Sequence, residues 1–182
     1  MKNTIIVNLI GAPGTGKSTL MAEVFSHLKW NKIDCEMVTE FAKELIWEKR
    51  YDTFKDELYI FAKQNHRLFI VNGKVDIIIT DRPLILTIPY NRTYGNKDNS
   101  LFNSSLENIV ISTHNLYNNV NILLNRTKPY NPNGRNQSEA ESDKLAIVFK
   151  NIVDEFGLDY TQMDADEKAV TKIIEIIKNN KK

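Results

Sequence analysis

The sequence predicts an α/β fold in which helices cover both faces of a parallel five-stranded sheet, giving three layers. Short segments rich in apolar and β-branched residues alternate with segments of helical periodicity, at 4–10, 34–40, 75–83, 120–125 and 159–164. Such alternation is typical of parallel strands joined by crossover helices. The 182 residues are 42% hydrophobic, enough for a sizeable core, and residues 1–182 are predicted to form a single domain.

The predicted elements follow one another in a regular order. Residues 4–10 (TIIVNLI) are almost continuously apolar, as expected of a central strand. After Gly16 the period changes, because Leu20, Val24 and Leu28 fall on one helical face. Residues 84–100 end in the turn-rich sequence YNRTYGNKDNS and are predicted to form a loop. Further helices are expected at 41–50, 54–72, 101–118, 138–156 and around 170–177.

Composition limits the classes of function. The net charge of +1 argues against general nucleic-acid binding, although a local basic groove stays open. The single cysteine, Cys35, excludes an internal disulfide framework. No apolar run is long enough for a membrane span, so we expect a cytoplasmic protein with no membrane partner. The oligomeric state is not predicted.

One loop carries the strongest motif. Residues 11–18, GAPGTGKS, fit GxxxxGK[ST] between a predicted strand and a predicted helix. The glycines let successive backbone N–H groups point at phosphate oxygens, and the helix dipole adds positive potential. Lys17 can reach the β- and γ-phosphates of ATP, and the Ser18 hydroxyl can bind Mg²⁺. The predicted nucleotide-binding residues are Gly11, Ala12, Pro13, Gly14, Thr15, Gly16, Lys17, Ser18 and Thr19.

An acidic residue ends the third predicted strand, in IIITDRP. Ligands of such sheets bind at the carboxyl ends of the strands, so Asp81 is placed to hold Mg²⁺ together with Ser18. The alternative is that Asp81 caps a helix beginning near Pro83. Arg82 follows directly and is suited to bidentate phosphate contact.

As an ordered set, these features resemble the P-loop nucleoside and nucleotide kinases. The segments TEFAKELIWE, IFAKQ and PYNPNGRNQSEAE resemble more narrowly the ribosylnicotinamide-kinase-like branch, whose relatives include many small phage and bacterial AAA-type ATP-binding proteins. The resemblance runs through about residues 4–178. It implies the strand order 2-3-1-4-5, a lid at about 126–142, and ATP and Mg²⁺ as cofactors.

The resemblance also implies roles for residues near the acceptor. Glu40, at the end of the second strand, corresponds to the carboxylate that takes the proton of the attacking hydroxyl, unless it only precedes the following helix. Lys43 and Gln64 correspond to positions that contact the acceptor, although a helix-surface role is an alternative for both. Whether Glu40 or Asp81 acts as the base stays open.

Two arginines lie in the predicted lid. By the same resemblance, Arg126 and Arg135 would join Lys17 in stabilising the transferring phosphoryl group, whose charge is spread over three oxygens. A plain solvated loop is the alternative. The implied catalytic residues are Lys17, Glu40, Asp81, Arg126 and Arg135, and the implied acceptor-binding residues are Glu40, Lys43, Gln64 and Arg82.

The predicted function is an ATP- and Mg²⁺-dependent kinase that phosphorylates a nucleoside-like small molecule or a nucleoside monophosphate. Glu40 favours the first acceptor and Arg82 the second. One alternative is a kinase acting on a nucleic-acid end or a hydroxylated base in DNA, which would need a basic groove near Lys43, Arg50 and Arg92. Another is a non-catalytic nucleotide-binding regulator.

Overall fold

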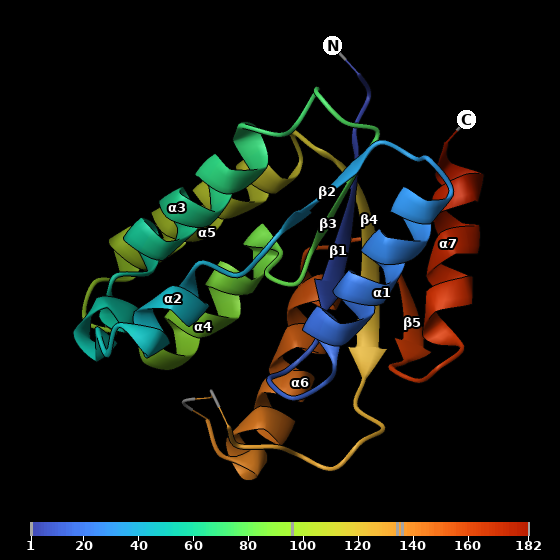
Figure 1. The fold of residues 1–182 in the computed structure, drawn as a ribbon. Helices are drawn as coiled ribbons and strands as arrows, with labels where there is room; N and C mark the ends of the chain where they lie inside the picture. The colour runs from blue at the N-terminus through green and yellow to red at the C-terminus, as the bar shows by residue number, and fades with distance from the viewer. Residues whose placement is uncertain (1, 96, 134, 136, 182) are drawn as a thin grey trace.

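A computed structural model describes residues 2–95, 97–133, 135 and 137–181. Its centre is a five-stranded sheet with the order β2-β3-β1-β4-β5, in which all four neighbouring pairs are parallel (Figure 1). The parallel sheet and its predicted order are therefore confirmed. The strands are β1 (Ile5–Ile10), β2 (Cys35–Val38), β3 (Ile77–Thr80), β4 (Asn118–Asn125) and β5 (Tyr160–Asp164).

The position of β1 at the centre of the sheet explains why its sequence is nearly all apolar. All six of its residues are buried, because β3 and β4 flank its edges and helices cover both its faces. Alternate side chains enter separate cores: Val7 and Leu9 on one face, Ile6 and Ile10 on the other. The register pairs Ile5 with Ile77.

Helices form the two outer layers, with α1 and α7 on one face of the sheet and α3, α4, α5 and α6 on the other (Figure 1). The short α2 packs against α3 instead of the sheet. The helices are α1 (Lys17–Trp30), α2 (Ala42–Trp47), α3 (Glu57–Phe69), α4 (Thr87–Tyr94), α5 (Ser100–His114), α6 (Glu139–Glu155) and α7 (Ala169–Asn180), with short 3₁₀ helices η1 (Tyr51–Lys55) and η2 (Leu84–Leu86).

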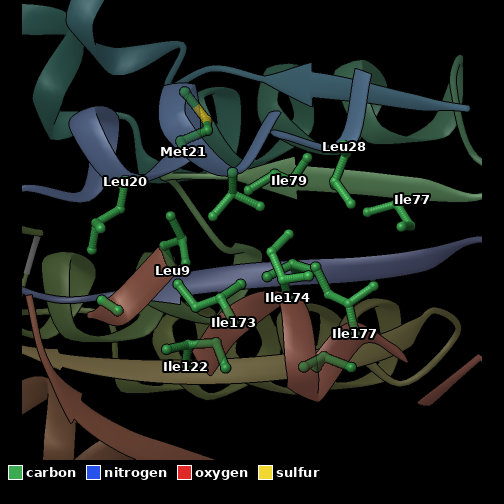
Figure 2. Close-up of a cluster of buried hydrophobic side chains, with 14 of the residues drawn as sticks. Leu9, Leu20, Met21, Leu28, Ile77, Ile79, Ile122, Ile173, Ile174 and Ile177 are labelled. Carbon is green, nitrogen blue, oxygen red and sulfur yellow. The ribbon is translucent and has the colours of Figure 1, made fainter. Parts of the chain in front are cut away.

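The core under α1 and α7 is built from aliphatic side chains (Figure 2). Leu28 of α1 and Ile173 of α7 are fully buried against Leu9 and Ile122 of the sheet. Burying a Leu or Ile side chain contributes about 1.5–3 kcal/mol. This packing fixes α1, and with it the loop that precedes α1, relative to the sheet.

The prediction of a loop at 84–100 is wrong for residues 84–94, which form η2 and α4. Tertiary contacts stabilise this polar helix: Asn91 donates to the Asn103 side chain at 3.0 Å, and Arg92 forms ion pairs with Glu107 and Glu155. Helix propensity is a weak prior that such contacts override. No helix among the described residues is long and apolar enough to cross a membrane.

The carboxyl ends of the strands share one edge of the sheet, where the loops after β1, β2, β3 and β4 begin. The segment predicted as a lid, 126–142, follows β4 at this edge, and its last residues already belong to α6, which begins at Glu139. Positions 134 and 136 of that segment lie outside the described residues.

Candidate active site

The loop between β1 and α1 has the conformation that its glycines allow. Gly14 and Gly16 have φ angles of 84° and 100°, in the left-handed region that L residues avoid. The Thr15 hydroxyl donates to the Ala12 carbonyl at 2.7 Å and closes the turn. The loop therefore curls in front of the N-terminus of α1, where backbone N–H groups and the helix dipole favour a phosphate.

Lys17 lies over this loop. Its Nζ donates to the Gly11 carbonyl at 2.7 Å and to the Ala12 carbonyl at 3.1 Å. Burial lowers the pKa of Lys17, while the nearby carboxylates of Glu40 and Asp81 oppose that shift. The ammonium group is thus placed beside the loop, and two carboxylates favour its charged form.

Asp81 joins the two sides of the site. Its Oδ2 accepts a hydrogen bond from the Ser18 hydroxyl at 2.6 Å, and its Oδ1 accepts one from the Glu40 backbone N–H at 3.0 Å. The following helix η2 has no side-chain cap, so the carboxylate does not play the alternative capping role. Mg²⁺ prefers oxygen ligands, and the Ser18 hydroxyl and the Asp81 carboxylate lie next to each other, so the two could hold this ion together.

Glu40 follows β2 and lies beside Arg82 in the cleft. Its Oε1 lies 3.6 Å from Arg82 Nε. Burial raises the pKa of Glu40, and Arg82 and then Lys17 lower it. The carboxylate therefore lies within the electrostatic influence of Lys17 and of the buried guanidinium of Arg82.

Glu57 is a site residue that the sequence analysis missed. It begins α3, is only 4% exposed, and its Oε2 lies 3.7 Å from Arg82 Nη2. Burial raises the pKa of Glu57 to about 7, although Arg82 acts in the opposite direction. Arg82 also stacks on the Tyr90 ring, 4.4 Å from its centroid. The available signal was an acidic residue on the same helical face as Ile60 and Leu68.

These residues line one cleft of about 520 Å³, a volume typical of small-molecule sites. Its apolar and aromatic lining residues include Ile46, Trp47, Phe54, Leu86 and Tyr90. The cleft brings together eleven of the sequence-predicted residues: Pro13, Gly14, Gly16, Lys17, Ser18, Thr19, Glu40, Lys43, Asp81, Arg82 and Arg135.

Gln64 does not line this cleft. It is 2% exposed, its Oε1 accepts the Phe41 backbone N–H at 2.9 Å, and its Nε2 donates to the Thr39 carbonyl at 3.3 Å. The amide therefore fixes the backbone on either side of Glu40 rather than facing the acceptor space.

The two arginines of the segment predicted as a lid line different cavities. Arg135 lines the cleft and donates to the Asn131 carbonyl, whereas Arg126 pairs with Glu139 and Asp143 of α6 and lines a separate groove. Both guanidinium groups lie 5.4 Å from the centroid of the Tyr130 ring. The cleft thus contains one of the two arginines assigned to the phosphoryl group.

A parallel sheet of this order, with a GxxxxGK[ST] loop after its central strand, defines the P-loop kinase fold. The sequence matches the AAA_28 family, described as an AAA domain, over residues 6–169. This match covers most of the chain, and the protein belongs to that family. A comparison with curated protein sequences gave no match.

Solved structures share the whole fold. NadR in complex with NR superposes with a TM-score of 0.72 at 18% identity, over 95% of this chain and 51% of that chain. Deoxyadenosine kinase from M. mycoides with bound dATP superposes with a TM-score of 0.62 at 19% identity, over 96% of this chain and 99% of that chain. NadR in complex with NAD and AMP-PNP superposes with a TM-score of 0.71 at 16% identity, over 98% of this chain and 50% of that chain. The chain therefore spans about half the length of the NadR chains.

Proposed function

We propose that this protein is a kinase that transfers the γ-phosphoryl group of ATP to a hydroxyl or phosphate of a small nucleoside-like acceptor. The observation that carries the proposal is the meeting of the phosphate loop, Lys17, Asp81 and Glu40 in one cleft. The folds of NadR and deoxyadenosine kinase support it. The same proposal treats residues 1–182 as one kinase domain with its lid at about 126–142.

Mg²⁺ fits this cleft through Ser18 and Asp81. No group of three or more His, Cys, Asp or Glu side chains in the described ranges could hold a metal by itself. That is the usual situation for Mg²⁺, which binds through one or two protein ligands and the phosphates of the nucleotide. The bound ion would neutralise phosphate charge, and Ser18 and Asp81 would fix its position.

Glu40 is the better candidate for the base. Both oxygens of Asp81 already accept hydrogen bonds, from Ser18 and from the Glu40 backbone, whereas the Glu40 side chain lines the cleft and, among the described residues, accepts no hydrogen bond that would occupy it in this way. Burial raises the pKa of Glu40, and a base works best when its pKa lies near the working pH. Glu40 would accept the proton of the attacking hydroxyl, and Lys17 and Arg135 would stabilise charge on the transferring group.

A small acceptor is favoured over a nucleic acid. The groove expected near Lys43, Arg50 and Arg92 has little free charge, because Arg50 pairs with Glu48 at 3.1 Å and Arg92 with Glu107 and Glu155. Nucleic-acid binding needs several unpaired cations along the backbone path. Gln64 acts in this proposal as a positioning residue behind Glu40, and Lys43 lies at the cleft where an acceptor would enter.

The test is a panel assay with labelled ATP, Mg²⁺, and nucleosides, their monophosphates, ribosylnicotinamide and oligonucleotides. We expect labelled product with a small acceptor, and we expect Glu40→Gln to lower kcat about 10²–10⁴-fold without changing the Kd for ATP. Glu36→Gln is the matched control, since Glu36 is exposed on β2 away from the cleft. Tight ATP binding without any product would instead favour a nucleotide-binding regulator.

A further inference from the structure

Two carboxylates surround the guanidinium of Arg82. Glu40 Oε1 approaches Nε at 3.6 Å and Glu57 Oε2 approaches Nη2 at 3.7 Å, so the two acids lie at different ends of the group. The Glu57 and Arg82 side chains are only 4% and 5% exposed. Within the described part of the chain, Glu57 Oε2, Arg82 Nε and Arg82 Nη1 have no hydrogen-bond partner.

Such an arrangement is poorly explained by stability alone. A buried ion pair seldom stabilises a fold more than apolar residues of similar volume would. Glu57 occupies the apolar face of α3 together with Ile60 and Leu68, where an apolar residue would pack without unpaired atoms. Because stability does not explain the charge of Glu57, we expect its role to lie in the cleft, which both Glu57 and Arg82 line.

We propose that Glu57 determines which acceptors enter: by neutralising Arg82 it keeps phosphorylated, anionic acceptors out and admits acceptors without a phosphate group. The inference rests on the proposed function and decides between its two classes of acceptor. With Glu57 present, a phosphate near Arg82 faces two carboxylates for one guanidinium, and like charges at such distances repel strongly. Without Glu57, Arg82 becomes a cation suited to bidentate phosphate binding.

Other cations of the cleft do not replace Arg82 in this role. Lys55 pairs with Asp52 at 2.9 Å, and its side chain is 77% exposed. Lys43 is exposed on α2, where water and salt screen its charge. Lys17 and Arg135 lie on the nucleotide side, next to the phosphate loop. Buried Arg82 is therefore the cation whose neutralisation matters most for an acceptor.

The experiment measures binding in the presence of AMP-PNP and Mg²⁺, with three probe pairs: deoxyadenosine and dAMP, deoxycytidine and dCMP, and ribosylnicotinamide and its monophosphate. We expect the wild type to bind the member without a phosphate group more tightly in its best pair. At about pH 8, where Glu57 is ionised, Glu57→Gln should strengthen binding of that monophosphate about tenfold or more. Asp56→Asn is the matched control, because it removes an exposed carboxylate one position away and keeps a capping side chain.

A second measurement on the wild type needs no variant. A nucleoside 5′-sulfate keeps a constant charge, so its affinity should rise as the pH falls from about 8 to about 6 and Glu57 takes up a proton. The groups that face Glu57 are Arg82, Glu40, Asp56 and Tyr90. Of these titratable groups, the Glu57→Gln variant lacks only the Glu57 carboxyl. In this variant the affinity for the 5′-sulfate should therefore depend less on pH. This readout would not respond to a purely structural role of Glu57.

Three results would overturn the inference: tighter monophosphate than nucleoside binding by the wild type, no gain in Glu57→Gln, or a 5′-sulfate affinity independent of pH. If Glu57→Gln does not fold, the wild-type comparisons decide alone. Failure of phosphoryl transfer to every acceptor would instead contradict the proposed function, because the selectivity is measured by binding and needs no turnover.

Discussion

At the scale of single residues, the phosphate loop depends on glycine at position 14 for two separate reasons. The φ angle of 84° is unfavourable for an L residue, and a Cβ atom there would lie 2.8 Å from the Tyr130 ring. Gly14→Ala should therefore lower the free energy of unfolding by about 1–2 kcal/mol from the backbone alone. It should also weaken ATP binding at least tenfold, because the loop must shift. Denaturant titration and nucleotide titration measure the two effects.

Gly157→Ala separates these causes. Gly157 has a φ angle of 60°, but a Cβ atom there would meet nothing within 4 Å. We expect the backbone cost of about 1–2 kcal/mol and an unchanged Kd for ATP. Equal ATP affinity in both variants would mean that the contact between Gly14 and Tyr130 has no importance for nucleotide binding.

Individual residues also show where sequence reasoning reaches its limit. The GxxxxGK[ST] loop could be predicted because its chemistry lies within eight consecutive residues. Glu57 could not be assigned in the same way, because its charged partner, Arg82, is distant in sequence. Gln64 lies on a helix, as predicted, but its amide binds backbone atoms and does not line the cleft. Local patterns identify residue types, and tertiary contacts decide which way a polar side chain faces.

At the scale of elements, α6 is tied directly to the phosphate loop. The Ser142 hydroxyl, 1% exposed, donates to the Pro13 carbonyl at 2.6 Å. Ser142→Ala leaves the part-buried Pro13 carbonyl without this partner, which costs about 1 kcal/mol of stability. Since Pro13 lines the cleft, we also expect a several-fold rise in the Kd for ATP, measured by calorimetric titration.

Ser138→Ala is the control for that prediction. Ser138 begins α6 with a capping box to Glu141 but is exposed and does not bond to the loop. Its loss should cost about 1 kcal/mol of stability and leave the Kd for ATP unchanged. An equal effect of both variants on ATP binding would show that helix stability, and not the contact with Pro13, controls the loop.

The same scale explains the error at α4. Its sequence TIPYNRTY is polar and contains Pro89, which is typical of a loop. Burial of Ile88 and the ion pairs of Arg92 with α5 and α6 compensate for the poor propensity. The strands could be predicted because period and composition fix them locally, whereas α4 depends on partners elsewhere in the chain.

At the scale of the whole molecule, two buried groups link folding to pH in opposite directions. Burial lowers the pKa of His114 from 6.5 to about 4, and burial raises that of Glu57 from 4.5 to about 7. As pH falls below 6.5 the unfolded chain binds a proton at His114 that the folded protein does not, so stability is lost. As pH rises above 4.5 the unfolded chain releases a proton from Glu57 that the folded protein retains, and stability is again lost.

Between about pH 4.5 and 6.5 these two contributions should nearly cancel in the wild type, since each shift corresponds to about 3 kcal/mol. In the difference between the unfolding free energies of a variant and the wild type, the contributions of the titratable groups that both proteins share cancel. Relative to the wild type, Glu57→Gln should gain stability with rising pH across this window, and His114→Gln should lose it. Denaturant unfolding at several pH values measures both slopes. Slopes of the same sign would contradict the opposite pKa shifts of His114 and Glu57. A folded state that binds a proton less readily at His114 and more readily at Glu57 must give slopes of opposite sign.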